Sequence, residues 1–153
     1  MGREDQRAQS SRVSASSQQA AEQATIILHS GSYDRVSYAL SLASICLAMG
    51  MVTHMLLTYG GLKRFVKGHL EDLEGTDSAF QVMFQRGKAS GGIRSIEETL
   101  ADTRKLGLKL YACPNALANM SIVPSDLVEE VDEVMGLATF VQLARNASIN
   151  WYI

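Results

Sequence analysis

Apolar runs alternate with amphipathic segments along most of this sequence. The strongest run, residues 25–29, is largely apolar, which is typical of a strand covered on both faces. After a short polar break, apolar residues recur at helical spacing, and we predict a helix that Asp34 caps and that ends near Met49. Residues 52–58 predict a second strand, because the run begins with β-branched residues. The pair Gly60 and Gly61 would end this strand.

The stretch over residues 62–92 is the least regular part of the pattern. A short helix is predicted over residues 62–70, with Lys63, Arg64 and Lys67 facing outward. The remainder shows little periodicity, apart from a short segment bounded by two phenylalanines. Irregular segments of this length are usually functional or mobile.

A clear helix start follows at Ser95. Glu98 stands three residues later, so the two side chains can form a capping box. Gly107 is expected to close this helix before a third strand that ends at Ala112.

The third predicted strand leads directly into Cys113, the residue with the clearest chemical potential. Pro114 suits the first turn of a helix, because its missing N–H is not needed there. Cys113 would then occupy the cap position, beside the unpaired amides and the positive end of the helix dipole. Such a placement favours the nucleophilic thiolate over the neutral thiol.

The remaining pattern completes an α/β fold. Residues 131–135 predict a fourth strand, residues 137–146 an amphipathic helix, and residues 148–153 a closing strand. Strands that alternate with helices favour a mostly parallel sheet with right-handed crossovers. We therefore predict a mostly parallel five-stranded sheet between helices, an α/β sandwich that occupies residues 23–153 as a single domain.

Composition and charge narrow the class of function. The 153 residues carry a formal net charge of −2, and no basic stretch interleaves with aromatic residues, so no nucleic-acid partner is expected. Two cysteines are too few for a secreted disulfide scaffold, which favours a reducing, cytoplasmic setting. Residues 1–22 contain no apolar core segment, so we predict a disordered tail and no signal peptide.

One charge-free stretch, between Arg35 and Lys63, is long enough to span a bilayer. Gly50, however, stands where a helix that starts near Asp34 would need a left-handed C-terminal residue. His54 would also be unfavourable in lipid. A buried helix followed by a buried strand explains the stretch better, and no stable membrane span is expected.

The carboxyl ends of parallel strands form the edge at which open α/β sheets bind ligands. Three predicted loops reach that edge and would form one crevice around Cys113. The residues expected to line it are His29, Ser30, Gly31, Gly60, Gly61, Pro114, Asn115 and Ala116. The glycine pair equally suits a simple turn, because the dinucleotide and P-loop fingerprints are both missing.

Cys46 and the histidines are not expected to carry the chemistry of a catalytic or metal site. Free cysteines often act as small buried hydrophobes, and Cys46, on the apolar side of its helix, is interpreted in this way. His29, His54 and His69 show no metal-ligand spacing, so no metal site is predicted. No cofactor is predicted either. His54 is expected to bond a backbone group inside the sheet, and His69 to face solvent.

Several segments together resemble the DsrE/DsrF-like proteins, a family that includes the TusD-type sulfur carriers. They are residues 26–31 with Asp34 and Arg35, residues 91–98, residues 106–113 and residues 134–140. The resemblance covers about residues 24–153. It implies a flavodoxin-like fold, homo- or hetero-oligomers such as trimers or hexamers, and sulfur carried as a persulfide or thiosulfonate on Cys113. It also implies exchange with TusA-type small carriers in cytoplasmic sulfur metabolism.

Three functions remain open at this point. In the leading hypothesis, Cys113 attacks a sulfane sulfur and later yields it to an acceptor thiol, by the chemistry of thiol–disulfide exchange. In the second, the protein is a non-catalytic oligomeric module that binds a small ligand or a protein; Trp151 and Tyr152 on the closing strand would suit an interface. The third is a one-cysteine peroxidase, which would form a sulfenic acid.

Overall fold

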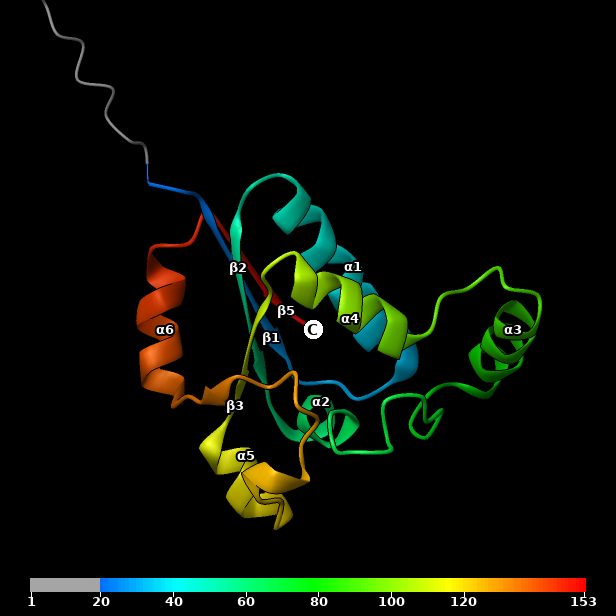
Figure 1. Cartoon of the computed structure of the whole chain (residues 1–153). Helices are drawn as coiled ribbons and strands as arrows, with labels where there is room; N and C mark the ends of the chain where they lie inside the picture. The colour runs from blue at the N-terminus through cyan, green and yellow to red at the C-terminus, as the bar shows by residue number, and fades with distance from the viewer. Residues whose placement is uncertain (1–19) are drawn as a thin grey trace, which may run out of the picture.

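Five parallel strands, in the order β4-β3-β2-β1-β5, form one sheet at the centre of the structure (Figure 1). The computed structural model describes residues 20–153, so the predicted tail over residues 1–22 lies outside the described residues except at its end. The strands are β1 Gln23–Leu28, β2 Val52–Leu57, β3 Lys109–Ala112, β4 Glu133–Val134 and β5 Ile149–Tyr152. The predicted mostly parallel five-stranded sheet is confirmed.

Helices cover both faces of this sheet and the carboxyl ends of its strands. They are α1 Tyr33–Ala48, α2 Tyr59–Arg64, α3 Ser78–Ala89, α4 Ile96–Lys105, α5 Pro114–Met120 and α6 Leu137–Arg145, with a 3-10 turn at Pro124–Asp126. Figure 1 shows α1 and α4 side by side on one face, α6 on the other, and α2 with α5 below the strand ends. α3 stands apart, at the end of a long excursion between α2 and α4.

The charge-free stretch folds as α1 followed by β2, as predicted. α1 buries Val36, Leu40 and Ala43, which recur at helical spacing, and Gly50 follows its end with φ +82°. Cys46 on the same helix is 3% exposed and belongs to a small apolar cluster, so its interpretation as a core residue is confirmed. Among the described residues, none of the helices is long and apolar enough to cross a bilayer.

The two predicted helix starts have different outcomes. Ser95 and Glu98 form the expected capping box at the start of α4, with two N–H to oxygen distances of 3.1 Å. Asp34 is not the cap of α1, because the helix starts at Tyr33, two residues earlier than a cap at Asp34 would set it, and Ser32 occupies the cap position. Asp34 lies in the first turn, where its negative charge is favourable near the helix N-terminus.

The segment after β2 departs most from prediction. Gly60 and Gly61 lie inside α2 and do not end the strand, and the predicted helix over residues 62–70 is wrong because α2 already ends at Arg64. Arg64, expected to face outward, is only 5% exposed, whereas Lys63 is exposed as predicted. The cause is tertiary: the first turn of α2 packs against the end of β1, which turns Arg64 inward.

The irregular stretch also contains α3, which the pattern did not predict as a helix. Asp77 caps α3 by accepting a hydrogen bond from the amide of Ala79 at 2.9 Å. Phe84 is the buried residue of this helix, whereas Phe80 and Met83, at helical spacing from it, stay exposed, so the apolar side of α3 is only partly covered.

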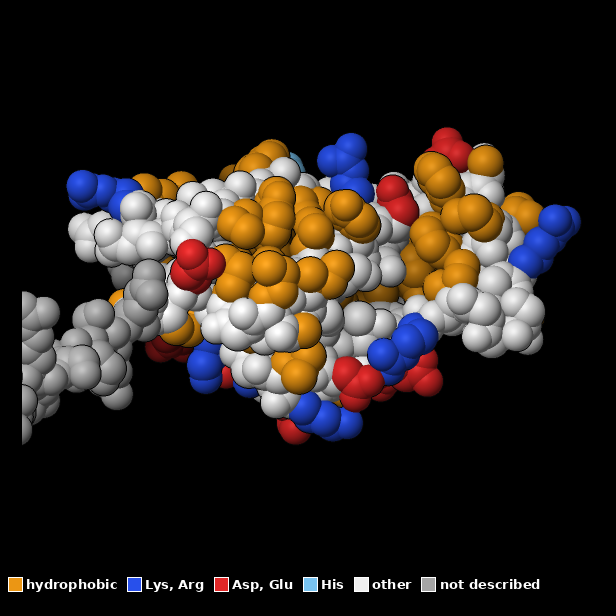
Figure 2. Space-filling model, turned by 90° about the horizontal axis from the view of Figure 1, so that it is seen from above, with side chains coloured by type: hydrophobic (Ala, Val, Ile, Leu, Met, Phe, Trp, Pro, Cys, Tyr) orange, Lys and Arg blue, Asp and Glu red, His pale blue; other side chains and the backbone are white. Residues whose placement is uncertain are grey.

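Exposed hydrophobic side chains gather on two helices. Figure 2 shows one group over α1 and a second over α3. The α1 group consists of Tyr38, Ile45 and Met49, whose spacing places them on one side of the helix. Their exposed fractions are 63%, 58% and 72%.

Candidate functional site

The residues that directly follow β2, β3 and β4 form a hydrogen-bonded row at the carboxyl edge of the sheet. The amide of Thr58 donates to the carbonyl of Leu28, and the amide of Cys113 donates to the carbonyl of Leu57, both at 3.0 Å. The amide of Met135 donates in the same way to Ala112, also at 3.0 Å. The parallel ladder therefore extends one residue past each strand, which sets Cys113 between Thr58 and Met135.

Cys113 occupies the cap position that the sequence predicts for it. Its backbone is extended, with φ −74° and ψ 121°, and Pro114 begins α5 directly after it. The thiol makes no hydrogen bond to the first turn and is 6% exposed, within the main apolar core. Of the neighbouring residues in α5, Pro114 and Asn115 are exposed and Ala116 is buried.

Tyr59, which sequence reasoning missed, is the most unusual residue at this edge. Its backbone has φ +43°, a value that bulky side chains rarely adopt. Its hydroxyl oxygen accepts a hydrogen bond from Nδ2 of Asn119 at 3.2 Å, and its ring lies 5.3 Å from that of His29. The ring of Tyr152 lies 5.7 Å from the same His29 ring. No local sequence signal marks a tyrosine for positive φ, because tertiary contacts impose this conformation.

The glycines after β1 and β2 allow the two loops to touch backbone to backbone. A Cβ on Gly31 would lie 2.7 Å from the carbonyl carbon of Gly60, and one on Gly60 would lie 2.7 Å from the amide nitrogen of Gly31. A Cβ on Gly61 would lie 2.9 Å from the carbonyl carbon of Leu28. These residues therefore serve close packing of α2 on β1, which the turn interpretation did not include.

A cavity of about 250 Å³ opens beside these glycines. It is lined by Ser30, Gly31, Ser32, Gly60, Lys63, Arg64, His69, Asp72, Glu74 and Gly75. Of the residues expected to line a crevice around Cys113, Ser30, Gly31 and Gly60 line this cavity, and Gly61, Pro114, Asn115 and Ala116 do not. His29 and Cys113 are not among its lining residues; His29 lies instead in the aromatic group around Tyr59.

Arg64 forms the inner wall of this cavity. Its Nε donates to the carbonyl of Gly31 at 2.9 Å, and its terminal nitrogens donate to the carbonyls of His69 and Glu74, both at 3.2 Å. Further bonds reach Asp72 and Gly31. Because each guanidinium nitrogen already has carbonyl partners, Arg64 fixes the loop that closes the cavity and is not available to a ligand.

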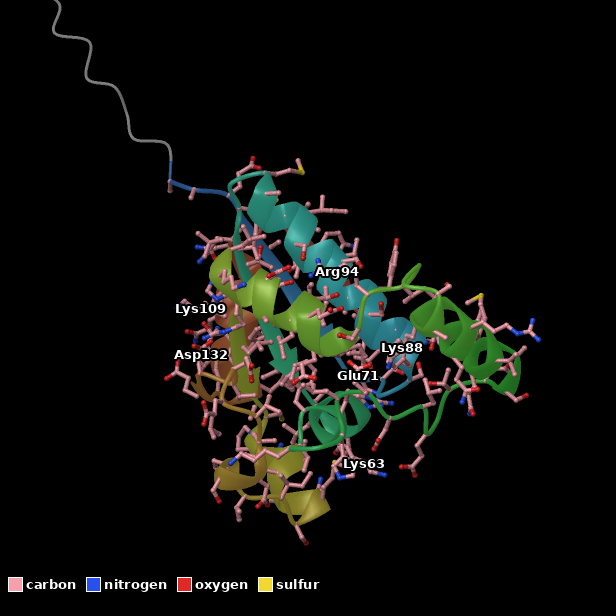
Figure 3. The ribbon with its side chains drawn as sticks, turned by 45° about the vertical axis from the view of Figure 1, so that its right-hand side comes forward. Lys63, Glu71, Lys88, Arg94, Lys109 and Asp132 are labelled. Atoms are coloured by element: carbon pink, nitrogen blue, oxygen red, sulfur yellow. The ribbon has the colours of Figure 1, made fainter. Side chains whose placement is uncertain are left out.

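The cavity carries charges of both signs at its rim. Nζ of Lys63 lies 3.2 Å from a carboxylate oxygen of Glu74, and Nδ1 of His69 lies 2.6 Å from Asp72. Figure 3 shows Lys63 on α2 at this side of the molecule. The pairing of positive and negative groups suits a small polar molecule better than a simple anion.

Neither of the other imidazoles points to a metal centre. Nδ1 of His54 lies 2.9 Å from the hydroxyl of Tyr111, so His54 bonds a side chain and not the backbone group that was expected. Burial lowers the pKa of His54, and the charge of Lys109 lowers it further. His69 is exposed as predicted. Within residues 20–153, the structure brings no group of His, Cys, Asp and Glu side chains together that could hold a metal ion.

Comparisons with known proteins give the family and the fold. Residues 74–152 match the model of the DsrE/DsrF/DrsH-like family. The crystal structure of the ychN protein from E. coli superposes with a TM-score of 0.56 at 13% identity, covering 86% of this chain and 99% of that one. The protein of unknown function MTH1491 from Methanobacterium thermoautotrophicum superposes with a TM-score of 0.51 at 16% identity, covering 85% and 98%. A comparison with curated protein sequences finds no significant match.

Proposed function

Because this chain belongs to the DsrE/DsrF/DrsH-like family, we propose that it is a sulfur carrier that loads sulfane sulfur onto Cys113 and passes it to an acceptor thiol. The observation that carries the proposal is the position of Cys113, at the cap of α5 and in the row of residues at the carboxyl edge of the sheet. This is the edge at which open α/β sheets bind their ligands.

The chemistry needs one sulfur atom of the protein. The Cys113 thiolate attacks the outer sulfur of a polysulfide or thiosulfate, the donor S–S bond breaks, and the shortened polysulfide or sulfite leaves with the electron pair. An acceptor thiolate then attacks the outer sulfur of the Cys113 persulfide and regenerates the Cys113 thiolate. The first-turn amides of Asn115 and Ala116 would stabilise the negative sulfur. No net oxidation occurs, so no second cysteine is required.

This chemistry also indicates a cellular compartment and an acceptor protein. Both cysteines are free thiols, which suits a reducing compartment such as the cytoplasm. The acceptor would be a thiol on a small TusA-like carrier.

Mass spectrometry of the intact chain tests the proposal. After incubation with polysulfide or thiosulfate, the protein should gain the mass of a sulfur atom, and dithiothreitol should remove it. Cys113→Ser should gain nothing, whereas Cys46→Ala, which keeps Cys113, should load like the unaltered protein. No added sulfur, or equal loading of Cys113→Ser, would contradict the proposal. Thermal unfolding of each variant verifies that the fold is kept.

A second candidate is a non-catalytic oligomeric module, favoured by two observations. The Cys113 side chain is packed in the apolar core, as a structural cysteine would be. The stripe of Tyr38, Ile45 and Met49 on α1 is an exposed apolar surface of the kind found at protein interfaces. In this proposal copies of the chain associate through α1, as a trimer or hexamer.

Sedimentation measurements test this assembly. Ile45→Glu should shift the protein toward monomers, because it places a charge in the middle of the stripe. Val123→Glu is the matched control, because it places the same charge on an apolar side chain that is 53% exposed but lies outside α1. A monomeric unaltered protein, or an unchanged oligomer in Ile45→Glu, would remove the proposal.

A further inference from the structure

Tyr59 is held in a conformation that its own chemistry disfavours. A side chain with a Cβ is crowded at φ +43°, and such residues persist only where surrounding contacts impose them. They are concentrated at functional sites, where the strain can be released in a step of the mechanism. The position of Tyr59 makes it relevant to Cys113, since Thr58, the residue before it, is the neighbour of Cys113 in the row at the sheet edge.

Two contacts hold Tyr59, and one of them reaches the cysteine helix. The ring packs on His29, and the hydroxyl oxygen accepts the hydrogen bond from Asn119. Asn119 lies near the end of α5, the helix that Cys113 caps. The bond therefore ties the first residue of α2 to the far end of α5, with Cys113 at the near end. Both partners are exposed, and Tyr59 is 42% exposed.

The thiol itself is nearly closed off from solvent. The whole residue Cys113 is only 6% exposed, so the approach of a sulfur donor to its Sγ is restricted unless neighbouring elements move. α2 and α5 are the two short helices that cover this edge of the sheet, as Figure 1 shows. A movement of the start of α2 away from α5 would break the Tyr59–Asn119 bond and allow Tyr59 to return to negative φ.

We propose that the Tyr59–Asn119 hydrogen bond is a latch that gates access to Cys113. With the latch closed, α2 and α5 are held together and the thiol is covered. With the latch open, relief of the strained backbone at Tyr59 offsets part of the lost contacts, and Cys113 is reached by its donor. The inference rests on the proposed function, in which Cys113 must be reached from outside, but it concerns access to the thiol and not the reaction that follows.

Alkylation of the two thiols by iodoacetamide tests the latch without any sulfur donor. Tyr59→Phe removes the acceptor and Asn119→Ala removes the donor, and each should raise the labelling rate of Cys113 about three-fold, the low end for one lost hydrogen bond between exposed groups. The double variant should label no faster than either single variant, because both remove the same bond. Tyr152→Phe, whose ring also neighbours His29, should leave the rate unchanged.

Cys46 serves as the internal reference. It lies in a small core cluster separate from that of Cys113, so its labelling rate reports openings of the fold that do not depend on the latch. The latch is overturned if Tyr59→Phe and Asn119→Ala leave the Cys113 rate unchanged, or if they raise the rates of Cys113 and Cys46 by the same factor. Either result concerns only the latch, whereas failure of sulfur loading in the unaltered protein contradicts only the proposed function.

Discussion

The hydroxyl of the fully buried Tyr33 lies 3.1 Å from Oε2 of Glu71 and donates a hydrogen bond to it. The same carboxylate pairs with Lys88 of α3 and accepts the amide of Glu97, at the start of α4, at 3.0 Å. Lys88 also lies 5.3 Å from the centre of the Tyr33 ring. Figure 3 shows Glu71 and Lys88 between the excursion and the body of the protein. This cluster therefore attaches the α3 excursion to α1 and α4.

The cluster predicts a loss of stability at alkaline pH. Burial, together with the charge of Glu71 and the hydrogen bond to it, raises the pKa of Tyr33 to about 12. The unfolded chain loses this proton near pH 10, so between these values the unfolded state binds fewer protons and the free energy of unfolding falls as pH rises. Below pH 10 the contribution is fully present. The decrease should be of order 2 kcal/mol, measured by urea unfolding at several pH values.

Tyr33→Phe isolates this effect. The variant should lose about 1 kcal/mol at neutral pH, because one buried hydrogen bond is missing, and its stability should fall less steeply above pH 10. Tyr38→Phe is the matched control, since Tyr38 is 63% exposed on the same helix. An alkaline slope in Tyr33→Phe equal to that of the unaltered protein would contradict the prediction.

The bonds of Asp132 should make the stability of the fold depend on pH in the acid range. Arg104 binds both carboxylate oxygens at 2.7 Å, and the amide of Leu110 donates to Oδ2 at 2.8 Å. Burial acts to raise the pKa of Asp132, but these hydrogen bonds outweigh it and hold the pKa below its ordinary value. The resulting stability is present above the ordinary carboxyl pKa of about 4 and is lost as pH falls through the lower pKa of the folded state.

Asp132→Asn should therefore cost about 1–2 kcal/mol at pH 7, since charge-assisted bidentate bonds are lost. The difference from the unaltered protein should shrink as pH falls below 4, measured by chemical unfolding. Glu129→Gln, which removes an exposed carboxylate, should change little at either pH. A difference that stays constant with pH would contradict the role given to the ionised carboxylate.

Even the small side chain of alanine should destabilise the fold at position 61. In Gly61→Ala the new Cβ would collide with the backbone carbonyl of Leu28, which cannot rotate away as a flexible side chain could. We expect a loss of about 2 kcal/mol and a lower melting temperature. Gly92→Ala is the control, because its Cβ would find no atom closer than Ser90 Oγ at 3.4 Å. Equal stability of Gly61→Ala and Gly92→Ala would show that α2 does not need this close approach.

The two thiols should differ in reactivity. Burial raises the pKa of the Cys46 thiol, which reduces its thiolate fraction. We expect iodoacetamide at pH 8 to label Cys113 about ten-fold faster than Cys46, measured by mass spectrometry of peptides. Slow labelling of both thiols at one common rate would favour the non-catalytic module over the sulfur carrier.

Local patterns in the sequence are sufficient for much of the fold. The apolar runs of β1 and β2, the capping box at Ser95 and the placement of Cys113 before Pro114 all depend on residues close together in the chain. Each is a local preference that the folded environment does not oppose. The parallel sheet then follows from the alternation of strands and helices.

Contacts between segments distant in sequence determine the burial of Arg64 and the path of the backbone at the start of α2. Arg64 is buried because backbone carbonyls from separate loops surround it, and Gly60 and Gly61 enter a helix because α2 packs on the end of β1. The positive φ of Tyr59 has no local signal, and the two side chains that contact Tyr59, His29 and Asn119, are distant from it in sequence. The sequence alone determined that a cysteine would stand at a strand-to-helix junction. The tertiary structure decided that its thiol is covered and which residues cover that edge, because burial depends on elements that meet only in the folded chain.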